Sequence, residues 1–215
     1  MKDWVTWHSG YDDPASPLRE RLDRVTWHLA RALDQTAPGP IRLLSLCAGQ
    51  GRDVLQVLPD HPRRLDVAAL LVEANQENAS LARCEAADAG LSEVQVREAD
   101  ASVVANFADV LPVDVLLLAG IFGNVGDADI KRTIDAAPAL CTLGATLIWT
   151  RHRRPPDLTG TMRSWFAAAG FEEVAFDELD NDYLTSVGVH RLARRSAGTS
   201  PATRQPLFTF GSHLS

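Results

Sequence analysis

Cysteine is scarce in this sequence of 215 residues, with only Cys47, Cys84 and Cys141, and no Cys-x-x-Cys pair occurs. An odd number of widely spaced cysteines argues against a disulfide framework and against a cysteine-based zinc site. We therefore expect no metal centre, and a protein that works in a reducing compartment.

Long apolar runs are also missing. The residues that follow Met1 do not form the apolar stretch of a signal peptide. The longest apolar run, Val110 to Phe122, is interrupted by Pro112 and Asp114 and is too short to span a bilayer. These features predict a cytoplasmic protein that does not interact with membranes.

Basic residues are fewer than acidic ones: the sequence has 21 Lys and Arg residues and 28 Asp and Glu residues, which gives a net charge of −7. Polyanion-binding proteins normally carry the opposite sign, so we expect no nucleic-acid partner. Lys2 and Lys131 are the only lysines, whereas arginine and alanine are abundant, which is typical of high-GC coding bias. Part of the arginine content therefore carries no functional information.

The length and the hydrophobic content of 46% suit a single α/β core with flanking segments. Residues 1–40 are predicted to form an aromatic, turn-rich segment followed by a helix, which Ser16 caps and Pro17 begins. Residues 41–193 form the main domain. Residues 194–215 are polar and are expected to be a loose tail, apart from Leu207–Phe210.

The main domain alternates apolar strand-like runs with helical segments, which predicts a doubly wound, mostly parallel sheet with helices on both faces. The expected strands are Ile41–Cys47, Val67–Val72, Val94–Arg97, Val113–Ala119 and Ala145–Thr150. The expected helices are Asp53–Leu58, Asn75–Ala89, Asp127–Ala137 and Thr161–Ala169. Phe171–Glu178 and Tyr183–Ala193 then follow without room for a helix between them, so they are predicted to form an antiparallel hairpin.

Four motifs follow the first four strands, at the sheet edge where ligands of such folds bind. Gly49-x-Gly51 allows close backbone approach to a ligand, although a tight strand-to-helix turn would need the same glycines. Glu73 is placed to accept hydrogen bonds from both ribose hydroxyls, and Asp100 from an exocyclic adenine amino group or from the backbone of a helix start. The fourth motif is Gly120-Ile121-Phe122-Gly123-Asn124.

The order of these elements, from about Ile41 to Ala193, resembles the class I, seven-stranded, Rossmann-like S-adenosylmethionine-dependent methyltransferases. The resemblance implies S-adenosylmethionine as cofactor and S-adenosylhomocysteine as product. It places the glycine turn beside the methionine part of the cofactor, Glu73 at the ribose and Asp100 at the adenine. The complete predicted cofactor set is Cys47, Ala48, Gly49, Gly51, Asp53, Glu73, Ala74, Asp100, Ala101, Gly120 and Tyr11.

The glycine motif departs from the family pattern, which usually begins with an acidic residue and contains three glycines. Ser45 stands at the acidic position and Cys47 at the first glycine position. The amino group of the methionine part therefore needs another partner, and a backbone carbonyl near Ala48 and the Asp53 carboxylate are the two candidates.

The expected methyl acceptor is a small molecule, since no RNA- or peptide-recognition module accompanies the fold. His152, at the end of the fifth strand, is the candidate general base, although a solvated histidine on the rim explains the sequence equally well. Arg151 and Arg153 beside it would attract an anionic acceptor, unless they only reflect coding bias. The other histidines outside the N-terminal segment, His61, His190 and His213, are interpreted as loop or strand-surface residues.

Phe122 and Asn124 are the remaining acceptor candidates, together with Trp7 in the N-terminal segment. Residues 1–16 are predicted to fold over the sheet edge as a lid that brings Trp7 and Tyr11 to the site. The alternative is that these aromatics cover the sheet edge or a dimer interface, and both a monomer and a homodimer are compatible with the sequence.

Two other functions compete with methyl transfer. An NAD(P)-dependent oxidoreductase shares the glycine turn and the ribose acid, but Gly49-x-Gly51-x-x-Val54 lacks the third glycine and the chain has no length for a substrate domain. A non-catalytic nucleotide-binding protein is the other alternative.

Overall fold

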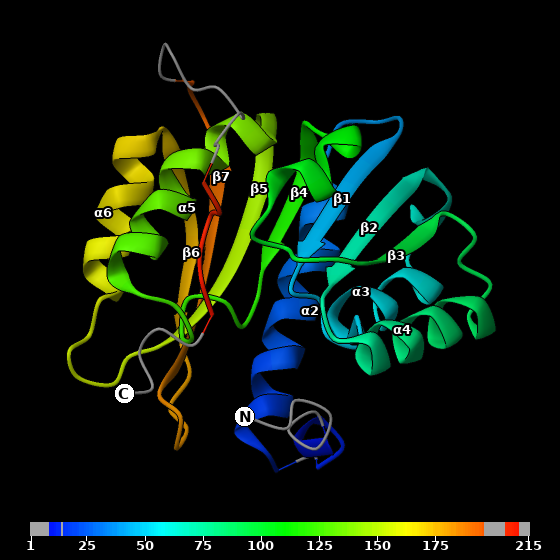
Figure 1. The fold of residues 1–215 in the computed structure, drawn as a ribbon, viewed down its shortest axis with the longest axis horizontal. Helices are drawn as coiled ribbons and strands as arrows, with labels where there is room; N and C mark the ends of the chain where they lie inside the picture. The colour runs from blue at the N-terminus through cyan, green and yellow to red at the C-terminus, as the bar shows by residue number, and fades with distance from the viewer. Residues whose placement is uncertain (1–8, 14, 196–204, 211–215) are drawn as a thin grey trace.

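The computed structural model describes residues 9–13, 15–195 and 205–210 (Figure 1). A short 3-10 helix, η1 (Ser9–Tyr11), precedes the long helix α2 (Pro17–Gln35). Ser16 caps α2 by accepting the backbone N–H of Leu18 at 3.2 Å, and Pro17 occupies the first turn, as the sequence predicts.

The sheet has seven strands in the order β3-β2-β1-β4-β5-β7-β6, which confirms the predicted fold class. The strands are β1 (Ile41–Leu46), β2 (Val67–Glu73), β3 (Val94–Glu98), β4 (Val113–Leu118), β5 (Cys141–His152), β6 (Phe171–Glu178) and β7 (Thr185–Leu192). Strands β1 to β5 pair in parallel, and β7 lies antiparallel to both β5 and β6. The parallel strands therefore present their carboxyl ends at one edge, which is the lower edge in Figure 1.

Helices cover both faces of the sheet. On one face α2 packs with α3 (Arg52–Leu55) and α4 (Gln76–Asp88), and on the other face lie α5 (Asp127–Leu140) and α6 (Thr159–Ala169). The predicted helix 53–58 is divided into α3 and the 3-10 helix η2 (Leu58–Asp60), and η3 (Arg64–Asp66) leads into β2. Alternate residues of the central strands face the two cores, as is expected for strands that are buried on both faces.

The connection from β3 to β4 contains no α-helix. It holds only two 3-10 helices, η4 (Val104–Asn106) and η5 (Ala108–Val110). Residues 205–210 lie over the face of the sheet that α5 and α6 cover, and they run beside α5 (Figure 1). The side chains of Leu207 and Phe208 are buried there, at 0% and 2% exposure. This segment contains the run Leu207–Phe210, which the sequence analysis sets apart from the loose tail, and its apolar side chains complete the core on that face.

Two of the histidines that the sequence analysis interprets as loop or strand-surface residues are buried, which corrects the strand-surface interpretation of His190. His190 in β7 is 1% exposed, and His61 after η2 is 7% exposed. The ring of His190 stacks on Phe166 of α6 at a centroid distance of 4.4 Å. Within the described ranges, no helix is both long and apolar enough to cross a membrane.

Candidate functional site

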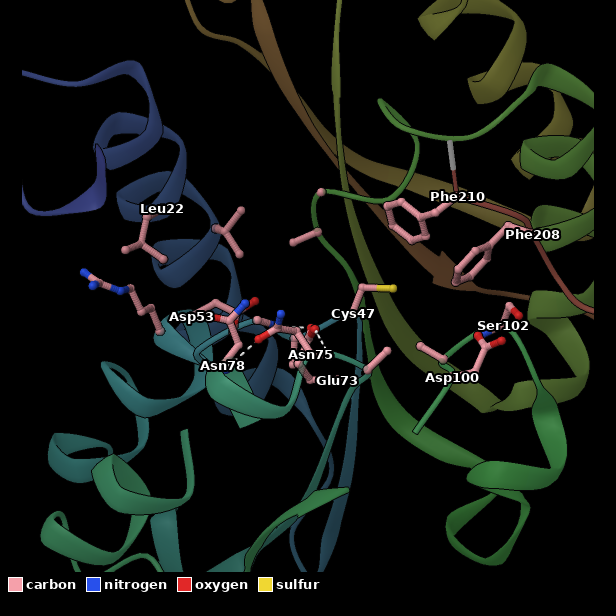
Figure 2. Close-up of a pocket in the computed structure, with 18 of the residues that line it drawn as sticks. Leu22, Cys47, Asp53, Glu73, Asn75, Asn78, Asp100, Ser102, Phe208 and Phe210 are labelled. Atoms are coloured by element: carbon pink, nitrogen blue, oxygen red, sulfur yellow. Dashed lines mark hydrogen bonds between the residues drawn. The ribbon is translucent and has the colours of Figure 1, made fainter. Parts of the chain in front are cut away.

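A cavity of about 640 Å³ opens at the carboxyl edge of β1 to β4. Its wall combines residues of η1 and α2, the glycine turn after β1, the loops after β2, β3 and β4, and the segment 205–210 (Figure 2). A pocket of this size, at the edge where the parallel strands end, is large enough for a nucleoside-type ligand.

The glycine turn forms the floor of the pocket in left-handed backbone conformations. Cys47 and Gly49 have φ angles of 54° and 57°, and both line the pocket. Burial raises the pKa of the Cys47 thiol well above its usual range, and Glu73 and Asp100 act in the same direction, so this thiol is neutral. The bend places the backbone N–H of Gly49 beside β2.

Gly51 lies outside the pocket lining, contrary to its predicted cofactor contact. It has a φ angle of 69° and begins α3. A Cβ at this position would lie 2.7 Å from Cδ1 of Leu71, so the glycine permits α3 to pack closely against β2.

The Glu73 carboxylate joins the glycine turn to the start of α4. Its Oε2 accepts the N–H of Gly49 and its Oε1 accepts the N–H of Asn75, both at 2.8 Å. A carboxylate has about four acceptor positions, so these two bonds fix its orientation and leave capacity for a ligand. Glu73 also lines the pocket, so it presents an oriented acceptor to a ligand there.

Asp100, Ala101 and Ser102 form the pocket wall after β3. Oδ1 of Asp100 accepts the N–H of Ser102 at 2.8 Å, and its backbone carbonyl accepts from Nδ2 of Asn106 at 2.9 Å. Figure 2 shows the rings of Phe208 and Phe210 on the same side of the cavity as Asp100 and Ser102.

The opposite end of the pocket carries charges of both signs. Asp53 is 8% exposed, and burial raises its pKa to about 6, although the N–H of Val54 and the Arg21 guanidinium lower it. Arg21 donates to the Tyr11 hydroxyl, and burial raises the pKa of that phenol. Tyr11, Arg21 and Asp53 all line the pocket, with Leu22 and Val25 of α2 as apolar neighbours.

No protein-family model matches the sequence, and no curated protein matches it. The structure matches an O-methyltransferase family protein from Burkholderia thailandensis, with a TM-score of 0.59 and 16% identity over 81% of this chain and 57% of that chain. It matches the carbon methyltransferase CurJ with a TM-score of 0.60 and 16% identity over 79% and 54% of the two chains. An RNA methyltransferase from Salinibacter ruber, in complex with S-adenosylhomocysteine, matches with a TM-score of 0.56 and 16% identity over 83% and 94%.

The fold is that of the class I methyltransferases. The chain spans little more than half the length of the first two of these proteins, at 57% and 54%. Among the cofactor residues expected from the resemblance to this fold family, Gly51 alone stands outside the pocket lining. The lining contains Tyr11, Cys47, Ala48, Gly49, Asp53, Glu73, Ala74, Asp100, Ala101 and Gly120.

The predicted acceptor residues after β4 make internal contacts instead. Phe122 is fully buried and packs against Trp149 and Phe166, with centroid distances of 6.2 and 6.5 Å. Asn124 donates through Nδ2 to the Gly120 carbonyl at 2.7 Å, and Arg151 donates to the carbonyl of Phe122. These side chains shape the loop after β4, and only Gly120 of the predicted motif borders the cavity.

The residues at the end of β5 also lie outside the pocket lining. Nδ1 of His152 accepts the N–H of Arg154 at 3.2 Å, and burial and two neighbouring arginines lower the pKa of this imidazole. Arg153 donates to the Leu179 carbonyl at 3.0 Å and pairs with Glu178 at 3.3 Å. Trp7 lies outside the described residues, so the lid formed by residues 1–16 stays a prediction.

Several lining residues are absent from the sequence-based set. Arg21, Leu22 and Val25 reach the pocket from the first turns of α2, and Asn75 and Asn78 from the start of α4. The caps locate these two helices in the sequence, and the apolar spacing of α2 includes Leu22 and Val25, but neither signal shows which side chains face the pocket. Phe208 and Phe210 belong to the one apolar run in an otherwise polar tail, which was the available signal for that wall.

Proposed function

We propose that this protein is an S-adenosylmethionine-dependent methyltransferase that acts on a small molecule. The observation that carries the proposal is that the glycine turn, Glu73 after β2 and Asp100 after β3 line the same cavity. The methyltransferase fold supports the same conclusion. The antiparallel strand β7 lies between β5 and β6, and the strand order therefore differs from that of dinucleotide-binding sheets. This difference argues against an NAD(P)-dependent oxidoreductase.

The residues of the pocket fit the nucleoside part of this cofactor. Glu73 is held with acceptor capacity for two ribose hydroxyls, and Asp100 would accept from the exocyclic amino group of adenine. Gly49 keeps the floor free of a side chain where the ligand would pass.

The amino-acid part of the cofactor carries an ammonium and a carboxylate, and the α2 end of the pocket offers one partner for each. Asp53 supplies a buried carboxylate for the ammonium, in place of the acidic residue that Ser45 replaces. Arg21 supplies a guanidinium for the carboxylate, and its hydrogen bond to Tyr11 orients it. Ser45 is itself 1% exposed within β1 and does not line the pocket.

The bound cofactor would supply an activated methyl group on its sulfonium. The chain then has to orient the donor, admit the acceptor and exclude water, which is mainly a matter of positioning. Leu22 and Val25 give α2 an apolar surface toward the pocket, and they are 5% and 2% exposed. The net charge of −7 favours a small acceptor over RNA.

His152 remains the proposed base only for an acceptor that extends from the pocket to the end of β5, since a base must lie within hydrogen-bond reach. Its lowered pKa keeps the imidazole neutral at pH 7, the form that accepts a proton. An acceptor nucleophile without a proton to lose needs no such group.

Calorimetric titration with S-adenosylhomocysteine and with NAD tests the proposal. Wild-type protein should bind S-adenosylhomocysteine more tightly, and Glu73→Ala should weaken that binding roughly 5- to 150-fold, because two hydroxyls lose their acceptor. Glu77→Ala, which removes an exposed carboxylate of α4, is the matched control and should bind like wild type.

Tighter binding of NAD, or an unchanged affinity in Glu73→Ala, would contradict the assignment. The acceptor class is tested with labelled S-adenosylmethionine. Methyl transfer to a metabolite extract, and none to total RNA, is the expected result.

A further inference from the structure

The segment 205–210, here called the C-terminal strap, is fixed to the body of the protein by several hydrogen bonds. The backbone N–H of Leu207 donates to the Ser102 carbonyl at 2.8 Å, and Oγ1 of Thr133 donates to the Leu207 carbonyl at 3.1 Å. The backbone N–H of Thr209 donates to Oδ2 of Asp129 at 2.8 Å. The strap is thus bonded both to the loop after β3 and to α5.

The strap occupies the place where the sheet lacks a crossover helix. The connection from β3 to β4 contributes only η4 and η5 to the face of the sheet that α5 and α6 cover. An apolar sheet face must be buried against other elements to be stable. Leu207 and Phe208 belong to the same buried cluster as Ala101 and Phe107 of this connection. The segment that completes the core therefore also forms a wall of the pocket.

Two aromatic rings of the strap reach the pocket. Phe208 is 2% exposed, whereas Phe210 is 40% exposed, and their rings meet edge to face at a centroid distance of 5.6 Å. Both lie at the end of the pocket that holds Asp100 and Ser102 (Figure 2). An aromatic ring beside a carboxylate acceptor suits a planar base that carries an amino group, because the base can stack on the ring and donate to the carboxylate.

We propose that the C-terminal strap is part of the nucleoside site, and that Phe210 stacks on the purine base. This proposal rests on the proposed function. If the ligand contacts the strap only when the strap is docked, the ligand binds the docked state more tightly than the undocked state. Binding of the nucleoside therefore stabilises strap docking, and a docked strap strengthens nucleoside binding. The amides of Leu207 and Thr209 report docking directly, because both are hydrogen-bonded in the docked strap.

The test compares Phe210→Ala with Tyr183→Ala in the full chain. Tyr183 is also 40% exposed, but it lies between β6 and β7 and does not line the pocket. Each protein is titrated with S-adenosylhomocysteine and, separately, with adenosine. Phe210→Ala should weaken both ligands by the same factor, roughly tenfold or more, whereas Tyr183→Ala should not change either affinity and Phe210→Trp should restore both.

Hydrogen exchange supplies the second measurement. S-adenosylhomocysteine should slow exchange at the Leu207 and Thr209 amides in wild type, and slow it less in Phe210→Ala at equal total ligand. Unchanged affinities in Phe210→Ala would overturn the strap proposal and leave the proposed function standing. A loss of affinity for S-adenosylhomocysteine but not for adenosine would also overturn it, because Phe210 would then not contact the purine. Wild-type protein that binds neither ligand would overturn the proposed function as well.

Discussion

Replacement of Asp53 by asparagine is expected to stabilise the folded protein above pH 6 and to weaken cofactor binding. Burial raises the pKa of Asp53 to about 6, from the ordinary value of 3.8. Between these two pH values the folded state holds the proton more tightly than the unfolded state does. The free energy of unfolding therefore falls as the pH rises through this window.

The rise of the pKa from 3.8 to about 6 corresponds to a stability cost on the order of 3 kcal/mol once Asp53 is ionised in both states. An asparagine side chain has nearly the same shape and no charge, and its oxygen can still accept the N–H of Val54, which Oδ1 of Asp53 accepts at 2.9 Å. The difference in stability between Asp53→Asn and wild type should thus be smallest near pH 4, should rise by up to about 3 kcal/mol by pH 7, and should then level off.

Urea unfolding at a series of pH values between 4 and 8 measures this difference. Asp60→Asn, at an exposed carboxylate, is the matched control and should show no such change across the window. In the same pH series the affinity of wild type for S-adenosylhomocysteine should increase as the pH rises through about 6, because an ammonium binds the ionised carboxylate. Asp53→Asn should lose that pH dependence. A stability difference that is independent of pH would refute the argument that Asp53 ionises at a cost in the folded state.

Two further substitutions test residues outside the pocket. Burial lowers the pKa of His190 to about 4, so folding disfavours its protonation and wild type should lose stability as the pH falls from about 6.5 toward 4. His190→Phe should remove this loss, as measured by urea unfolding at pH 4.5 and 7.5, and an equal acid sensitivity in the variant would contradict the burial argument. Arg153→Ala should cost about 1 kcal/mol of stability through the lost bond to the Leu179 carbonyl and leave the affinity for S-adenosylhomocysteine and the turnover unchanged. Turnover that falls in this variant, while its stability stays at the wild-type value, would instead support the anionic-acceptor interpretation of the basic residues.

The main helices and strands, and the edge of the sheet where the pocket lies, could be predicted from the sequence. Ser16 and Pro17 mark the start of α2, and alternating strand and helix patterns locate β1 to β5, because caps and periodicity are local properties of the chain. Glu73 and Asp100 could be assigned to one site because parallel strands end at the same edge. The bounds of β5 were less accurate, since Cys141–His152 extends the predicted strand at both ends.

Contacts between distant parts of the chain could be identified only in the folded protein. The guanidinium of Arg153 is bound to the carbonyl of Leu179, and the burial of His190 depends on α6. The contact of Thr209 with Asp129 joins the strap to α5. Each of these contacts connects residues that are far apart in the chain, and local propensity carries no information about such pairs. The same reason explains why a tail that is polar in composition becomes a wall of the pocket: the missing helix between β3 and β4 leaves a sheet face that Leu207 and Phe208 can bury.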